Sequence, residues 1–223
     1  MKLRVLLKNH AGWQVSLLLT GLFLVVYYRW FFWLEANVVP RYIMHTTLDD
    51  ILPFCPYFVL PYIAWFPFIY GVLFYFFLFS PADFKRTGIL LAAGQIVCLI
   101  IYTLFPNGQD LRPVIAADSG LFNDIVAWIY ASDTPTNVCP SIHVLGTIII
   151  QAGIFHCKRL AGRHWLKIGT TLLSLSIIMS TMLIKQHSVI DVGAAIVLAA
   201  TLYIPAYVLP KIRDYTKDRK KGT

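Results

Sequence analysis

The chain has 223 residues, of which 58% are hydrophobic and 13% are charged. Soluble domains carry about 25% charged residues, so this composition indicates an integral membrane protein and excludes an ordinary soluble domain. The net charge of +8 does not point to a nucleic-acid partner, because the basic residues lie in short tracts between apolar runs.

Six apolar runs alternate with polar segments along the chain. They cover approximately residues 13–34, 57–79, 87–105, 141–157, 168–184 and 189–209. The first run is about 20 residues long and no small-residue cleavage site follows it, so it is expected to stay as a span rather than act as a signal peptide. The predicted fold class is an all-α integral membrane protein with six transmembrane helices in one domain, residues 1–223.

The longest polar segment, residues 106–140, separates the third and fourth spans. Apolar residues recur in it at helical spacing: Leu121, Phe122, Ile125, Val126 and Ile129. Asp118 or Ser119 is the expected N-cap. The pattern predicts a helix that lies in the membrane interface rather than across the bilayer.

The distribution of Lys and Arg predicts the orientation of the spans. Of these 19 residues, 15 lie at the N-terminus, in the second-to-third turn, in the fourth-to-fifth turn and in the C-terminal tail. With six spans these segments share one side, which the positive-inside rule makes cytoplasmic. Segment 106–140, His143 and His187 then share the opposite face.

The stretch from Ser180 to Asp191 carries the first group of polar residues. His187 and Asp191 are four residues apart, which places them on one face of a helix. A carboxylate that holds one ring nitrogen of a histidine leaves the other nitrogen nucleophilic or basic. Ser180 lies two helical turns before His187, and Thr181 lies one turn before Lys185. A purely structural His–Asp pair is the alternative.

The tetrapeptide Pro140-Ser141-Ile142-His143 carries the second group, at the start of the fourth span. Proline suits the first turn of a helix, and the free amides of that turn together with a serine hydroxyl can bind an anion. His143 could donate a proton to a leaving oxygen beside that anion. An ordinary helix start with an interfacial histidine is the alternative.

Arg112 in the Arg112-Pro113 pair is a third candidate. A planar guanidinium binds phosphate with two hydrogen bonds. An arginine near lipid headgroups is the alternative reading for this residue on its own.

In this order the three motifs resemble those of the type 2 phosphatidic acid phosphatase superfamily. The matching positions are Arg112-Pro113, Pro140-Ser141-x-His143, and Ser180 with His187 and Asp191. The resemblance covers roughly residues 105–193. The chain departs from the family pattern at three positions: Phe105 stands where the family has Lys, Ile142 where it has Gly, and Thr181 where it has Arg.

The resemblance implies a role for each matching residue. His187 would be the nucleophile that forms a phosphohistidine, Asp191 would orient it, and His143 would protonate the leaving alcohol. The phosphate would be bound by Arg112, Ser141 and the amides around Ile142, with Ser180 and Thr181 nearby. Lys185 is inferred to replace a missing motif cation. No metal and no cofactor is expected, since cations and amides can stabilise the phosphoryl group.

The leading hypothesis is therefore metal-independent hydrolysis of a lipid phosphate monoester or pyrophosphate at the outer face of the plasma membrane. Its expected partners are the lipid substrate and the membrane, with no nucleic acid. Two alternatives stay open: transfer of a phosphoryl headgroup such as inositol phosphate to a lipid alcohol, and a non-catalytic membrane protein that keeps the fold. The oligomeric state, the headgroup and the chain length are left open.

Overall fold

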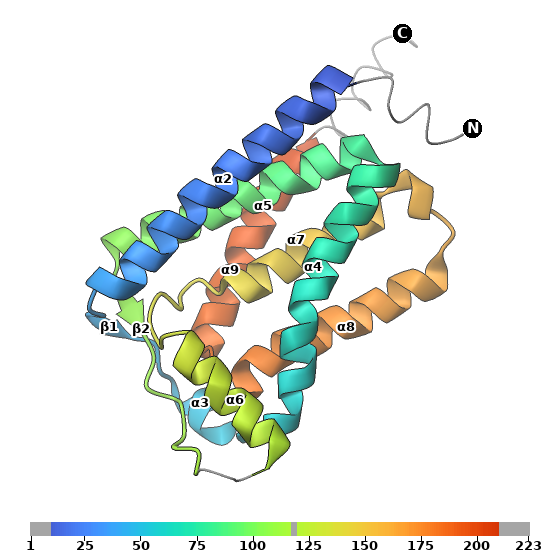
Figure 1. The fold of residues 1–223 in the computed structure, drawn as a ribbon. Coiled ribbons are helices and arrows are strands. Elements are labelled where there is room, and N and C mark those ends of the chain that lie inside the picture. The colour runs from blue at the N-terminus through green and yellow to red at the C-terminus, as the bar shows by residue number, and fades with distance from the viewer. Residues whose placement is uncertain (1–9, 117–119, 210–223) are drawn as a thin grey trace, which may run out of the picture.

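The structure is a computed structural model that describes residues 10–116 and 120–209, and it is built almost entirely from helices (Figure 1). The long helices are α2 (His10–Asn37), α4 (Val59–Phe79), α5 (Pro81–Leu104), α8 (His164–Leu183) and α9 (Val189–Tyr203). Helix α9 continues into a π-helical turn, η4 (Ile204–Val208). The shorter elements are α3 (Thr47–Ile51), α6 (Leu121–Ser132), α7 (Ile142–His156) and the 3₁₀ turns η2 (Pro56–Phe58) and η3 (Lys158–Leu160).

Five helical segments of the described chain are long and apolar enough to cross a membrane. They are Leu17–Asn37, Pro56–Phe79, Pro81–Leu104, His164–Leu183 and Val189–Val208. Helix α7 is apolar but has 15 residues, a length of about 22 Å against a hydrocarbon core of about 30 Å. These findings confirm a helical, multi-pass membrane protein.

Helix α7 lies at the centre of the bundle and packs against α4, α5, α8 and α9 (Figure 1). Close approach of α5 depends on Gly153, where an added Cβ would lie 2.7 Å from the Thr87 hydroxyl oxygen. Its neighbours cover most of the helix, including Val144, Ile150 and Ile154. Helix α7, which is shorter than the hydrocarbon core is thick, is thus surrounded by other helices of the protein.

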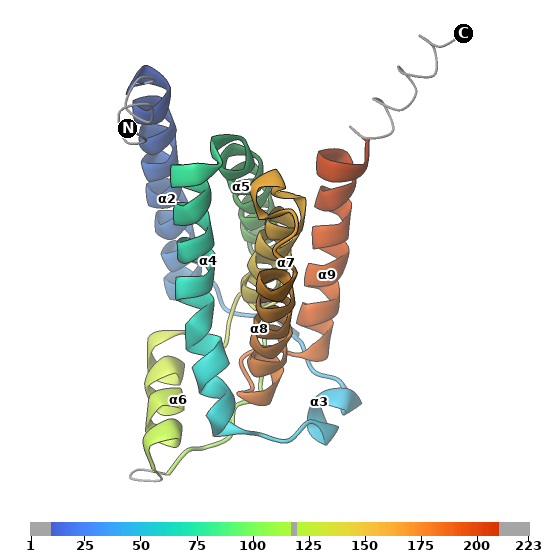
Figure 2. The same ribbon diagram turned by 90° about the vertical axis from the view of Figure 1, so that its right-hand side faces the viewer.

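The connections between helices separate to the two ends of the bundle (Figure 2). The α4–α5 turn and the α7–α8 connection lie at the end where α2 begins and η4 finishes. Helices α3 and α6 lie at the opposite end. The start of α7 and the α8–α9 turn also lie at this opposite end, so the two polar stretches predicted to meet do share one end of the bundle.

Some element boundaries differ from those predicted. Helix α5 begins at Pro81 because Ser80 and Asp83 form its first turn, with the Ser80 hydroxyl donating to Asp83 Oδ2 at 2.6 Å. The N-cap of α6 is Gly120, whose φ of 108° suits glycine. The N-cap prediction of Asp118 or Ser119 was therefore wrong, and the structure of those two residues lies outside the described part.

Two elements lie in segments predicted to be loops. Helix α3 begins at Thr47, with a capping box formed by Thr46 and Asp49. Strands β1 (Tyr42–Ile43) and β2 (Asn107–Gly108) form a two-residue parallel pair. The pair joins the segment after α2 to the segment after α5 and thereby brings α3 beside the predicted site.

Candidate active site

His143 lies in the first turn of α7 and is held by aromatic side chains. Its ring centroid is 4.8 Å from that of Tyr62 and 4.6 Å from that of Trp65. The Trp65 indole nitrogen also donates a hydrogen bond to the His143 carbonyl at 3.0 Å. Ser141 is the N-cap of α7, and its hydroxyl oxygen accepts from the Val144 amide at 3.3 Å. Packing and capping together define where His143 points.

His187 lies opposite His143, with 5.7 Å between the two ring centroids. It belongs to the turn between α8 and α9 rather than to a helix. Lys185 has a left-handed φ of 55°, which lets the chain turn back after α8. The amides of Gln186 and His187 then both donate to the Thr181 carbonyl at 2.9 Å.

Asp191 contacts His187 as predicted, but through a different local structure. Its Oδ2 atom lies 3.3 Å from His187 Nδ1 and accepts from the Ser188 amide at 2.8 Å. Ser188 is the N-cap of α9, so the carboxylate lies in the first turn, where the helix dipole favours negative charge. With Nδ1 engaged by Asp191, Nε2 is the ring nitrogen left for chemistry.

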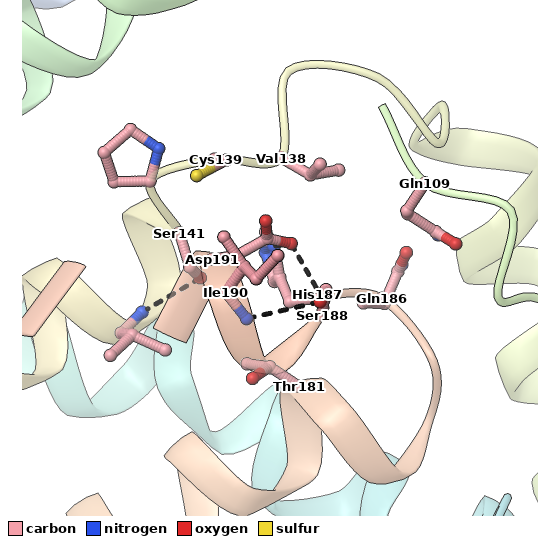
Figure 3. A network of polar contacts seen from close by, with 12 residues as sticks. Gln109, Val138, Cys139, Ser141, Thr181, Gln186, His187, Ser188, Ile190 and Asp191 are labelled. Atoms are coloured by element: carbon pink, nitrogen blue, oxygen red, sulfur yellow. Dashed lines mark hydrogen bonds and ion pairs between the residues drawn. The ribbon is translucent and has the colours of Figure 1, made fainter. Parts of the chain in front are cut away.

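A backbone hydrogen bond joins the two polar stretches, since the Ser141 amide donates to the Asp191 carbonyl at 3.2 Å. Figure 3 shows His187 and Asp191 beneath the loop that carries Val138 and Cys139. Asn107 supports this loop: its Oδ1 accepts from the amides of Val138 and Cys139 at 2.9 and 2.8 Å. The sequence assigned no role to Asn107, although it lies in the same segment as Arg112.

Beyond this support, the Tyr102 hydroxyl donates to the Pro140 carbonyl at 2.5 Å. Tyr102 is fully buried near the end of α5. The position of the α7 entrance therefore depends on polar contacts from α5 and from the segment after it.

Arg112 contacts Gln186, the residue before His187 in the α8–α9 turn. Its Nη1 donates to the carbonyls of Tyr130 and Asp133 at 3.1 and 2.8 Å, and its Nη2 donates to Gln186 Oε1. The guanidinium also lies 4.6 Å from the centre of the Tyr130 ring. Burial lowers the pKa of Arg112. Arg112 is therefore linked to the cavity by its hydrogen bond to Gln186, a lining residue that the sequence did not suggest.

The geometry contradicts the predicted role of Lys185. Its ammonium donates to the carbonyls of Asp49 and Leu52, both at 2.6 Å, at the C-terminal end of α3. The inference assumed that helical spacing continues from Thr181 to Lys185, whereas α8 ends at Leu183. Lys185 therefore binds α3 and does not replace the missing motif cation.

Ser180 and Thr181 do not reach the site either. The Ser180 hydroxyl donates to the Ile177 carbonyl at 2.6 Å, and the Thr181 hydroxyl donates to the Ile178 carbonyl at 2.8 Å. Both hydroxyls are thus satisfied within α8. The expectation that Ser180 lies on the face of His187 fails for the same reason as for Lys185, because the helix ends between them.

A cavity of about 1130 Å³ opens beside the two histidines. His143, His187, Ile142, Gln186 and Asp133 line its polar end, and apolar side chains of α2, α4 and α5 line the rest. Burial raises the pKa of the Asp133 carboxyl, although Arg112 acts in the opposite direction. The arrangement thus combines a nucleophile–carboxylate pair, a second histidine and an apolar chamber.

At the polar end of the cavity, the hydrogen-bond donors available to an anion are backbone amides and a side-chain amide. Among the residues that the structure describes, Gln186 Nε2 is buried without a hydrogen-bond partner. The Val144 amide donates to Ser141, which leaves the amides of Ile142 and His143 in the first turn of α7 without an acceptor inside the helix. No group of three or more His, Cys, Asp or Glu residues within 10–116 and 120–209 is placed to hold a metal ion.

Comparisons with known proteins give no match: no family model matches the chain, and no curated protein or solved structure is significantly similar to it.

Proposed function

We propose that the protein is a lipid phosphatase that hydrolyses a phosphate monoester or pyrophosphate through a phosphohistidine at His187. One observation carries the proposal: a His187–Asp191 pair faces His143 across 5.7 Å at the polar end of an apolar cavity. Two histidines at this separation can contact one phosphoryl group, one from the attacking side and one from the leaving side. The motif resemblance to the type 2 phosphatidic acid phosphatase superfamily supports the same chemistry.

The first step is attack of His187 Nε2 on phosphorus, with formation of an N–P bond and cleavage of the bond to the lipid oxygen. Asp191 keeps the proton on Nδ1 and stabilises the positive charge that the ring acquires. His143 donates its proton to the leaving lipid oxygen. The α7 amides, Gln186 Nε2 and the nearby Arg112 stabilise the phosphoryl oxygens.

The second step is hydrolysis of the phosphohistidine. Water attacks phosphorus while His143, now neutral, accepts a water proton. The N–P bond breaks and returns His187 to its starting state. Phosphate leaves, and each histidine has regained its initial protonation.

For the membrane arrangement we propose six spans, with α7 as a short span enclosed by its neighbours. The ends of the bundle support this layout, because the α4–α5 turn and the α7–α8 connection, which carry Lys and Arg, lie at the opposite end from the α8–α9 turn (Figure 2). The proposed site then faces the outside of the plasma membrane, and its substrate is a lipid of the outer leaflet.

Transfer of the phosphoryl headgroup to a lipid alcohol is the second candidate. It is favoured by the apolar character of the cavity beside His187, which would admit an alcohol with a hydrocarbon chain. The intermediate on His187 Nε2 would then keep the headgroup on its phosphorus, and the acceptor alcohol would attack in place of water. Product analysis with and without an added long-chain alcohol separates them.

The decisive experiment measures phosphate release by purified protein from a panel of lipid phosphates in the presence of EDTA. His187→Ala is expected to lower turnover at least about a thousandfold, as loss of a covalent nucleophile does. The exposed His164 supplies the control, because His164→Ala should leave turnover unchanged. An acid-labile phosphate adduct should form on the wild type and be absent from His187→Ala. Full activity of the His187 variant would contradict the proposal.

A further inference from the structure

Helix α3 is the first of two supports of the α8–α9 turn that carries His187. Asp49 on α3 accepts a hydrogen bond from the Ser188 hydroxyl. Carbonyls at the C-terminal end of the same helix accept from the Lys185 ammonium. Because Lys185 precedes His187 in the turn and Ser188 follows it, α3 holds the chain on both sides of this histidine.

The segment that follows β2 is the second support of this turn. Gln109 is buried, and its Nε2 donates to the Lys185 carbonyl at 3.1 Å. Three residues later in the same segment, the guanidinium of Arg112 donates to the Gln186 side chain. The turn therefore depends on two supports from separate parts of the chain, and a contact between these supports would fix both of them relative to each other.

His45 makes such a contact. It lies shortly before α3, and its Nε2 is 2.8 Å from Oδ1 of Asp50 on that helix. Its Nδ1 is 2.8 Å from Oδ1 of Asp110 in the segment after β2. Backbone contact between the two segments continues up to this point, because the Met44 amide donates to the Gly108 carbonyl at 2.7 Å. One histidine thus joins a carboxylate of each support.

The geometry indicates the protonation state of the His45 ring. A neutral imidazole has one N–H group and one lone pair, so it can donate to only one of the two carboxylates. Its other nitrogen would then face a carboxylate oxygen at 2.8 Å with both atoms as acceptors, which is repulsive. An imidazolium donates from both nitrogens. The two short contacts therefore describe a protonated His45.

The surroundings of His45 leave its charge under the control of the medium. Asp50 and Asp110 are the carboxylates in contact with it in the part of the chain that the structure describes, and all three side chains are exposed. The hydrogen bond to Asp50, and then the one to Asp110, raise the pKa of His45 above its usual value near 6.5. The other charged side chains of the two supports have the partners described above, and they are Asp49, Lys185 and Arg112.

We propose that His45 is a pH-dependent clamp that joins the two supports of the α8–α9 turn when it is protonated and releases one of them when it is neutral. Since the pKa of His45 is raised in the folded protein, the clamp is fully closed below the unfolded value near 6.5 and opens as pH rises through the folded value. The clamp requires no particular chemistry at His187, so it stands independently of the proposed function.

The test measures amide hydrogen exchange of residues 184–188 in the full chain at pH 6 and pH 9. The amides of Lys185, Gln186 and His187 are bonded to carbonyls of α8, so they exchange when the turn opens locally. His45→Gln keeps a neutral polar side chain at both pH values, and a comparison at equal pH cancels the intrinsic pH dependence of exchange. The turn should exchange about threefold faster in the variant at pH 6 and equally fast at pH 9.

Two further variants complete the experiment. Asp110→Asn should also speed exchange at pH 6, and it should lower the titration midpoint of His45 measured by NMR on ¹³C-labelled histidine. This variant carries the comparison if His45→Gln fails to fold. The control is His164→Gln, at the exposed start of α8, which should match the wild type at both pH values. Equal exchange of the wild type and His45→Gln at pH 6, or a difference of the same size at pH 6 and pH 9, would overturn the proposal.

Discussion

The two histidines that face each other are held by opposite means. His143 lies on the central helix and is fixed by ring contacts with Tyr62 and Trp65 inside the bundle. His187 lies on a turn and is held by polar contacts: Asp191 contacts its ring directly. Helix α3 contacts the neighbouring residues Lys185 and Ser188 of the same turn. Apolar packing is insensitive to charge, whereas contacts of the second kind depend on which groups are ionised.

The contacts between α3 and the α8–α9 turn use charges of both signs. Asp49 accepts from the Ser188 hydroxyl at 2.6 Å and from the Val189 amide at 2.8 Å, at the N-terminus of α9. Lys185 donates in the other direction to the last carbonyls of α3. Each charge thus lies at the helix end whose dipole it complements. We infer that Asp49 and Lys185 are positioning residues for His187.

The largest effect is expected from breaking the contact between His187 and its carboxylate. Asp191→Asn keeps the size of the side chain but removes the charge that selects the Nδ1–H tautomer. The expected loss in kcat is about a thousandfold or more, with a smaller change in KM. The exposed Asp124 on α6 gives the control variant Asp124→Asn. An Asp191→Asn enzyme within tenfold of wild-type kcat would show that this pair is merely structural.

A change at His143 should separate its two proposed roles. His143→Gln cannot protonate a lipid oxygen, so turnover of lipid phosphates should fall about a hundredfold or more. With p-nitrophenyl phosphate, whose leaving group needs no proton, a rapid burst of nitrophenolate should precede slow hydrolysis of the phosphoenzyme. The control is His156→Gln at the other end of α7. Absence of a burst would show that His143 does not assist hydrolysis of the phosphohistidine.

Loss of the Lys185 ammonium should have a smaller effect through position alone. Lys185→Gly removes the two hydrogen bonds to α3, while glycine accepts the φ of 55° readily. We expect kcat to fall about tenfold, because a small displacement of the nucleophile is costly, with KM for the phosphate nearly unchanged. A direct phosphate ligand would instead raise KM strongly and would be rescued by Lys185→Arg. Lys158→Gly, in η3 at the far end, is the control.

The smallest expected effect is on the pH dependence of thermal stability, through the carboxylate of Asp49. Although burial raises the pKa of Asp49, hydrogen bonds from Ser188, Val189 and Thr46 outweigh it and lower the pKa below its usual value near 3.8. A lowered folded-state pKa stabilises the protein above the unfolded pKa, and this stabilisation is lost as pH falls through the folded value. Asp49→Asn should therefore have a lower melting temperature than the wild type at pH 7, and the difference in melting temperature should become smaller below pH 4. A difference that stays constant down to pH 3 would contradict the lowered pKa of Asp49.

The sequence predicts the apolar runs well, because a lipid environment leaves few alternatives to a helix. It also predicts the pairing of His187 with Asp191, although the reason given for it was wrong. The failures cluster at the α8–α9 turn. Lys185 has a left-handed backbone conformation there, which residues other than glycine and asparagine rarely adopt. The local sequence therefore does not indicate the turn.

Other residues whose roles were not predicted from the sequence have a different physical explanation. Asn107, Gln186 and Asp49 contribute through contacts with residues far away in the chain, such as Asp49 with Ser188. The two-residue pairing of β1 with β2 that brings α3 to this end is too short to leave a periodic pattern. Ser180 and Thr181 bond to their own helix, an option that spacing alone does not reveal.

The hydrogen bond from the Ser141 amide to the Asp191 carbonyl bears on how such a site can change over generations. The bond uses backbone atoms alone, so this link between the two histidine-bearing segments requires no particular side chain at either position. Side chains at positions 105, 142 and 181, where the chain departs from the motifs it resembles, can then change while this backbone link persists. A chain with such a link can change its substrate while the segments that carry the two histidines stay joined.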